Sequence, residues 1–174
     1  QFGDRFSAPD NRPMLAKDRV TGNIPDSGDN IRIIPLGGVA EVGRNMTVLE
    51  YKNDIFVVDA GFSFKDESAP GIDYILPNTK YLEERKHKIR AVLVTHGHLD
   101  HIGAIPYIMP LIGNPPIYTR LLTAVMIKKR QEEFPQMPAL DIRVVEKSQT
   151  VSLGGLNINF FSVTHTIPDA MGII

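Results

Sequence analysis

Residues 96 to 101 read His-Gly-His-Leu-Asp-His, which places three of the five histidines and one aspartate within six positions. In an extended loop, side chains alternate in direction, so His96 and His98 are expected to point the same way. Asp100 and His101 fall where a helix is expected to begin, and they project from another direction. The spacing predicts two neighbouring ligand sets, and neutral imidazole with carboxylate suits zinc, manganese or iron.

These side chains have a plainer interpretation, as helix caps or solvated groups beside a strand end. A lone histidine would favour that interpretation, but four candidate ligands in the pattern HxHxDH reverse the balance. His165 follows a later predicted strand, and it can supply a third imidazole if that strand end lies beside the first cluster. His87 lies in a charged run and is expected to be a solvated helix residue.

The segments around the cluster must supply the strands that position it. A continuous apolar run from Arg90 to Thr95 predicts a strand buried on both faces. Further strands are predicted over 31–36, 46–51, 54–59, 117–119, 142–146, 150–153, 156–163 and 171–174, with turns at Lys52-Asn53 and Gly154-Gly155. Helices are predicted over 78–86, after His101 as a short helix disturbed by prolines, and over 121–134.

The composition limits the function classes. The 174 residues carry a net charge of −1, which weakens the case for a basic protein that coats nucleic acid by charge alone. They include no cysteine, which excludes thiolate ligands and a cysteine nucleophile. Residues 1–30 show no strand or helix period, so we expect a flexible arm there. No apolar run approaches the roughly 20 residues needed to cross a bilayer, so no membrane contact is expected and a cytoplasmic location fits.

The motif HxHxDH after a strand, an earlier aspartate that ends another strand and a later lone histidine together resemble the metallo-β-lactamase superfamily. Asp59 in the run Val-Val-Asp-Ala-Gly matches the earlier aspartate. The resemblance implies that Asp59 orients the ligand loop by hydrogen bonding, while the plain alternative is a turn aspartate. It also implies an α/β (α+β) fold, the αββα sandwich, of which residues 31–174 would form the N-terminal part.

Several further runs resemble the bacterial ribonuclease J family, a β-CASP branch of that superfamily. They are Pro35–Met46 (PLGGVAEVGRNM), Gly71–Pro77 (GIDYILP) followed by Tyr81-Leu82-Glu83, and His165–Ala170 (HTIPDA). The resemblance covers all but the N-terminal arm. Thr166 stands where that family often has serine, and the hydroxyl is kept.

This resemblance implies a ligand arrangement and a substrate. His96, His98 and His165 would hold one divalent ion, and Asp100 and His101 would help to hold a second, with zinc expected and manganese as the alternative. Asp100 would also orient the attacking water and accept its proton. The substrate would be RNA, cut endonucleolytically and processively from the 5′ end. A homo-oligomer of the full-length protein and partners from RNA decay are also expected.

Two other function classes stay open. A small-molecule hydrolase of thioesterase or lactonase type shares the fold, but such enzymes complete the metal site within one compact domain. A non-catalytic scaffold or partner-binding subunit could retain the motif without the chemistry. Sequence beyond Ile174 would separate the enzyme classes, because an insertion of β-CASP size favours the nuclease.

The family pattern includes a further bridging aspartate, another late histidine and the β-CASP insertion, none of which occurs in residues 1–174. We therefore predict that purified 1–174 has weak or no nuclease activity and an incomplete second metal site. The measurement is hydrolysis of 5′-monophosphorylated RNA with added zinc or manganese. Robust turnover would contradict this prediction.

Overall fold

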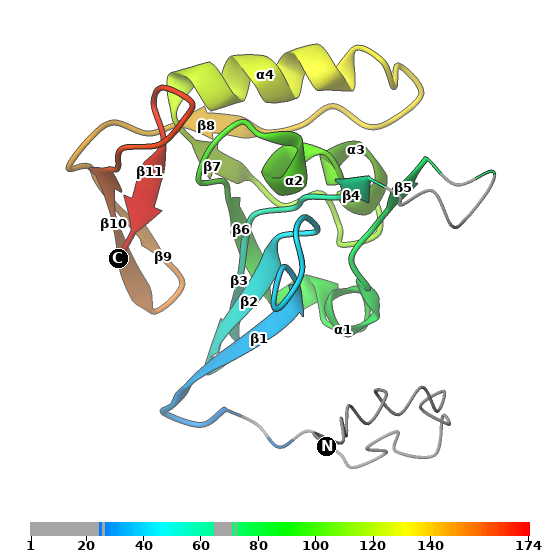
Figure 1. The fold of residues 1–174 in the computed structure, drawn as a ribbon. Helices are drawn as coiled ribbons and strands as arrows, with labels where there is room; N and C mark the ends of the chain where they lie inside the picture. Colours follow the sequence, from blue (N-terminus) through cyan, green and yellow to red (C-terminus); the bar gives the residue numbers. More distant parts are fainter. Residues whose placement is uncertain (1–24, 26, 65–70, 72) are drawn as a thin grey trace, which may run out of the picture.

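A computed structural model describes residues 25, 27–64, 71 and 73–174 (Figure 1). Residues 1–24 and 26, which make up most of the predicted arm, lie outside the described residues, so that prediction stays open. Among the described helices, none is both long and apolar enough to cross a membrane.

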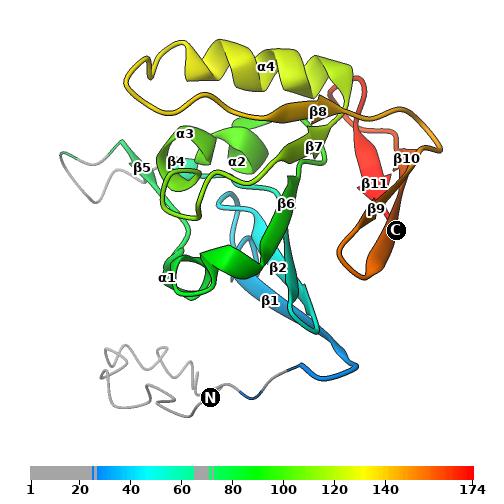
Figure 2. The ribbon, with the colours of Figure 1, turned by 180° about the vertical axis from the view of Figure 1, so that it is seen from behind.

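A six-stranded mixed sheet forms the centre of the fold. Its order is β1 (Ile31–Gly37), β2 (Met46–Tyr51), β3 (Asp54–Val58), β6 (Ile89–Leu93), β7 (Ile117–Thr119) and β8 (Ile142–Val144). Strands β1 to β3 are antiparallel neighbours, whereas β3, β6, β7 and β8 run parallel to one another. The run from β6 through β7 to β8 is clear from behind (Figure 2).

Two smaller sheets flank this centre. An antiparallel sheet contains β11 (Met171–Ile173), β10 (Leu156–Ser162) and β9 (Thr150–Leu153), in that order. Strands β4 (Ser63–Phe64) and β5 (Tyr74–Ile75) form a short antiparallel pair. The predicted turn at Gly154-Gly155 joins β9 and β10, as expected.

The helices are short except for one. They are α1 (Lys80–Glu83), the 3₁₀ helix η1 (Lys86–Lys88), α2 (Leu99–Ile102), α3 (Ile105–Ile108) and α4 (Leu121–Gln131). Pro106 lies in the first turn of α3, where its missing N–H costs no helical hydrogen bond.

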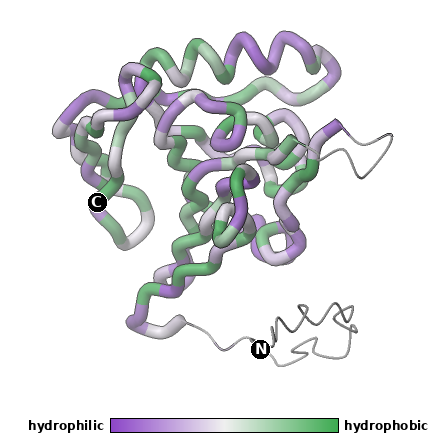
Figure 3. Tube along the Cα trace, in the orientation of Figure 1, coloured by the Kyte–Doolittle hydropathy of each residue, from purple (hydrophilic) through white to green (hydrophobic). Residues whose placement is uncertain are grey.

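Apolar side chains pack on both faces of the main sheet. On one face, Val57, Val92 and Ile117 pack with Ile102, Ile105 and Ile127 of the helices. On the other face, Phe56, Leu93 and Tyr118 pack with Ile158, Phe160 and Met171 of the smaller sheet. Figure 1 shows this layering, and in Figure 3 the hydrophobic colour follows the central strands while the later turns of α4 are hydrophilic. The predicted α/β architecture of layered helices and sheets is confirmed.

Several predicted bounds were wrong. The helix predicted over 78–86 is two short pieces, because Arg85 departs from helical geometry (φ −123, ψ 19). The helix predicted after His101 begins already at Leu99 and includes the histidine. Helix α4 ends at Gln131 and not at Phe134, which precedes Pro135 and is therefore disfavoured in helical conformation. Strand β8 ends at Val144, short of the predicted Glu146. The pair β4–β5 was not predicted.

The parallel pairing of β3 with β6 brings two distant segments together. Val58 lies opposite Leu93, and the amide of Asp59 donates to the carbonyl of Leu93 at 3.0 Å. Because parallel strands end at the same edge of a sheet, the residue after β3 lies beside the loop after β6. This edge carries the polar cluster.

The segment after Asp59 is interlocked with the loop that contains the HxHxDH motif. Ala60 N donates to His101 O at 2.8 Å, and Gly61 N donates to Asn45 O at 3.0 Å. A Cβ on Gly61 would lie 1.5 Å from the carbonyl oxygen of Asp100, which no relaxation of a side chain can relieve. The two backbones can therefore approach this closely only because residue 61 is glycine.

Replacing Gly61 by Ala should destabilise the protein by about 3 kcal/mol or more, because the two backbone segments must separate. The free energy of unfolding from urea titration measures this effect. Gly155→Ala is the matched control, since its Cβ would meet Tyr51 at an ordinary 3.5 Å and should change stability by less than about 0.5 kcal/mol. Equal effects of the two substitutions would contradict the interlock.

Candidate metal centre

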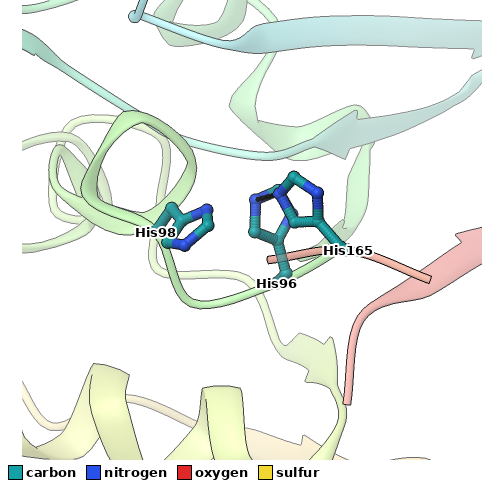
Figure 4. A group of neighbouring side chains, drawn as sticks. All are labelled: His96, His98 and His165. Carbon is teal, nitrogen blue, oxygen red and sulfur yellow. Dashed lines mark hydrogen bonds between the residues drawn. The ribbon is translucent and has the colours of Figure 1, made fainter. Parts of the chain in front are cut away.

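Three imidazoles converge at the edge of the sheet where β6 ends. The candidate ligand atoms of His96, His98 and His165 all lie within 4.8 Å of one another, and they form the only group of three candidate ligands among the described residues. His96 and His98 come from the loop between β6 and α2, and His165 comes from the loop before β11 (Figure 4). His165 thus lies beside the first cluster, and its role as a metal ligand stays a prediction.

Asp59 joins this loop to the end of β3. It is buried and has a positive φ of 62°, a conformation that aspartate tolerates better than most residues. Its Oδ1 accepts a hydrogen bond from Thr95 N at 2.8 Å, and its Oδ2 contacts His101 Nδ1 at 2.8 Å. Because a carboxylate only accepts, Nδ1 of His101 carries a proton, while its Nε2 lies 3.2 Å from Asn45 Nδ2.

Thr95 transmits the same constraint to His96. The Thr95 hydroxyl donates to Asp59 at 2.9 Å to 3.0 Å and lies 2.9 Å from Nδ1 of His96. Since its single proton goes to the carboxylate, the hydroxyl oxygen accepts the N–H of His96. The lone pair of His96 Nε2 is then directed toward His165 Nε2, which lies 3.0 Å away.

The pKa of His96 is lowered to about 4. Burial is the largest cause, and the neighbouring imidazoles of His101, His165 and His98 add to it. His96 is therefore neutral at physiological pH, which is the form that binds a metal. For His101, burial opposes the charged form, but the hydrogen bond and charge of Asp59, with the charge of Asp100, outweigh it and raise the pKa.

Asp100 and His101 belong to helix α2 and lie next to the three imidazoles. His101 Nε2 and Asp100 Oδ2 are 3.3 Å apart, and Asn45 Nδ2 donates to the same carboxylate oxygen at 2.9 Å. Asn45 also donates to the backbone carbonyl of Asp100 at 3.0 Å. Asn45 thus fixes both the backbone and the side chain of Asp100.

An open hollow of about 630 Å³ borders this cluster on the side of His98 and Asp100. Its other walls are mainly apolar; they are Val42, Gly43, Phe62, Ser63, Phe64 and Leu99. Phe64 is largely exposed and packs edge-on against Phe62, with ring centroids 5.0 Å apart. The hollow leaves room for a bound molecule beside the side chains that can hold a metal.

The donor set fits a divalent cation. Two imidazole nitrogens on one tetrahedral zinc ion are separated by roughly 3.3 Å, and the Nε2 atoms of His96 and His165 are 3.0 Å apart. With no cysteine in the chain, the available ligands are imidazole nitrogen and carboxylate oxygen. Hydrogen bonding to Nδ1 already orients two of the rings, as in metal sites where carboxylates orient the histidine ligands.

Most of these residues, but not all, could be predicted from the sequence. His96, His98 and His165 come together; Asp100 and His101 form the neighbouring pair; and Asp59 makes the hydrogen bonds expected of it. His87 is exposed in η1, away from the cluster, as expected. Thr95 appeared in the sequence only as the end of the predicted strand and was given no role, although it directly precedes His96 and its hydroxyl contacts that ring. Nothing in the sequence pattern indicated the contacts of Asn45 with Asp100.

The fold and the histidine cluster agree with a comparison of the sequence with protein families. Residues 39–173 match the metallo-β-lactamase superfamily, and the chain belongs to that superfamily. The solved structure of the Rm3 metallo-β-lactamase superposes with a TM-score of 0.54 at 18% identity, covering 81% of this chain and 55% of that one. At that identity the likeness shows the fold alone.

Within the superfamily, the sequence is similar to ribonuclease J. The Thermus thermophilus protein of that name is 39% identical over 152 residues, which cover 84% of this chain and 26% of the relative. Ribonuclease J of Corynebacterium glutamicum is 43% identical over 145 residues, or 83% of this chain and 20% of the relative. The chain thus spans about a quarter or less of the length of these relatives, and the resemblance to ribonuclease J is confirmed.

The contact between Thr95 and His96 predicts the effect of a nearly isosteric substitution. Thr95→Val removes the hydroxyl that fixes the tautomer of His96 and should weaken zinc binding by about 10-fold to 100-fold. Competition with a chelating indicator measures the affinity. Thr95→Ser keeps the hydroxyl and should bind zinc within about 3-fold of the parent; equal affinities of the valine variant and the parent would contradict the role of Thr95.

Proposed function

We propose that this chain forms part of a metal-dependent ribonuclease that hydrolyses RNA phosphodiester bonds. The observation that carries the proposal is the convergence of His96, His98 and His165 beside Asp100 at one edge of the sheet. The similarity to proteins named ribonuclease J supports RNA as the substrate. Cleavage both within the RNA and processively from its 5′ end belongs to the same proposal.

We divide the proposed metal ligands into two sets by the positions of their side chains. His96, His98 and His165 would hold one divalent ion, and Asp100 with His101 would help to hold a second. Zinc is the proposed metal, with manganese as the alternative, because both accept imidazole and carboxylate ligands. Divalent ions bound there would supply Lewis-acid chemistry, which lowers the pKa of a bound water and neutralises charge on a phosphate.

Asp100 is the proposed proton acceptor. Within the described part of the chain, hydrogen bonds engage its Oδ2 through Asn45, and none engages Oδ1. Its side chain is 39% exposed and borders the hollow, so a carboxylate oxygen faces the space where a substrate would lie. Asp100 can therefore orient an attacking water and accept its proton while Asn45 holds the carboxylate in place.

The alternative, a thioesterase or lactonase on the same fold, would use the same three imidazoles. The relatives named ribonuclease J favour RNA over a small ester. The cytoplasmic location, the homo-oligomer and the partners from RNA decay stay predictions.

The decisive variant is His98→Ala in the full-length protein. Loss of one of the three imidazoles should abolish stoichiometric zinc loading and lower RNA hydrolysis by more than about 100-fold. This loss exceeds the roughly 10-fold to 100-fold effect of removing a residue that only hydrogen-bonds to a metal ligand. Elemental analysis and cleavage of 5′-monophosphorylated RNA measure the two effects.

His87→Ala is the matched control, because this exposed histidine lies outside the cluster, and it should load metal and cleave RNA as the parent does. Full RNA hydrolysis by His98→Ala would contradict the proposed metal centre, whereas a full-length parent that hydrolyses no RNA would favour the scaffold interpretation. Hydrolysis of thioesters or lactones without hydrolysis of RNA would favour the small-molecule enzyme.

A further inference from the structure

The three imidazoles are not held equally well. Nδ1 of His96 contacts Thr95, whereas no hydrogen bond among the described residues engages Nδ1 of His165. His165 is exposed, and so are its chain neighbours Thr164 and Thr166. The position of this ring therefore depends on how the backbone of its loop is attached to the rest of the fold.

The loop is attached at its C-terminal end. Val163 N donates to Ala170 O at 3.2 Å, which closes the loop on itself, and Met171 N donates to Thr95 O at 2.9 Å. Asp169 directly precedes Ala170 in this loop, and its backbone has a positive φ of 65°. A non-glycine residue keeps this conformation only where its surroundings compensate for it.

Asp169 makes two side-chain contacts with the start of helix α4. Its Oδ1 accepts from Arg120 Nε at 2.8 Å, and its Oδ2 accepts from the backbone N–H of Leu122 at 3.2 Å. We call these two contacts the Asp169 junction. The first-turn N–H groups of a helix lack partners within the helix, so a carboxylate from another segment satisfies one of them and faces the positive end of the helix dipole.

Arg120 is itself fixed by the main sheet. It directly follows β7, whose last residue, Thr119, is buried and donates its hydroxyl hydrogen to Val94 O at 2.9 Å. The Arg120 and Asp169 side chains are only 17% and 23% exposed, so the ion pair is partly shielded from solvent. Glu146 lies 3.9 Å from Arg120 but is mostly exposed and competes weakly.

We propose that Asp169 is a positioning residue that holds the backbone of the His165 loop against helix α4 and thereby keeps the His165 ring in reach of the metal bound by His96 and His98. This inference rests on the proposed metal centre. Asp169 is four residues from His165 in the chain, and its side chain contacts Arg120 and Leu122, so it acts through the loop and does not touch the metal or the substrate.

A double-mutant cycle in the full-length protein tests this inference. Asp169→Gly removes both contacts but tolerates the positive φ, so it isolates the junction from backbone strain. It should weaken zinc binding about 10-fold in the parent, measured by competition with a chelating indicator. In a His165→Ala background the same substitution should change the affinity by less than about 2-fold, because the ring that it positions is gone.

A second readout reports the ligand set directly. The visible absorption of the cobalt-substituted protein depends on the number and type of ligands, and Asp169→Gly should shift it toward the spectrum of His165→Ala. Arg120→Met should act like Asp169→Gly, whereas Arg143→Met is the matched control, because Arg143 pairs with Asp141 away from the three imidazoles. If the glycine variant does not fold, Asp169→Asn carries a weaker form of the cycle: asparagine also tolerates positive φ, and it removes the charge and one of the two acceptor oxygens.

The outcomes separate the two proposals. The same fold-loss of zinc affinity from Asp169→Gly in both backgrounds, or no loss in the parent, would overturn the positioning role and leave the metal centre intact. A parent protein that binds no zinc, or a His165→Ala variant that binds it as well as the parent does, would overturn the metal centre and the positioning role together.

Discussion

The carboxylate of Asp59 is the contact on which the candidate metal centre depends. It accepts hydrogen bonds from the Thr95 amide, the Thr95 hydroxyl and His101 Nδ1, all between 2.8 Å and 3.0 Å. These bonds fix the backbone where β6 ends and the proton positions on two imidazoles. One buried side chain thus orients the rings of His96 and His101. The parallel pairing of β3 and β6 brings Asp59 to Thr95.

The neighbouring segments protect this arrangement by close packing of backbone. Gly61 lets the chain pass against the carbonyl of Asp100, and Asn45 links both to the loop after β1. Three loops from different parts of the sequence therefore share backbone hydrogen bonds directly behind the ligands. By contrast, the loop that carries His165 is joined to Thr95 by a backbone hydrogen bond from Met171 and to the start of helix α4 by Asp169.

The motif and the strands around it could be predicted from the sequence because both depend on local patterns. HxHxDH, Asp59 at a strand end and the apolar run of β6 each have a fixed spacing that reports geometry. Contacts between distant segments could not be predicted in this way. Asn45 meets Asp100 across 55 residues and Arg120 meets Asp169 across 49, and no spacing rule connects them. The end of helix α4 was missed although Pro135 is a local signal, because the pre-proline restriction on Phe134 was not weighed against the helical periodicity.

His96 and His165 are 69 residues apart in the chain, yet their nitrogens meet at 3.0 Å. An unfolded chain would have to close that long loop to rebuild the pair, and the entropy of closure opposes this. An ion held by both rings therefore binds the folded chain and not the unfolded one. Above its dissociation constant, each tenfold rise in free ion concentration then adds about 1.4 kcal/mol to the free energy of unfolding. The concentration of free metal would thus set the fraction of the protein that is folded, as well as the fraction that carries the ion.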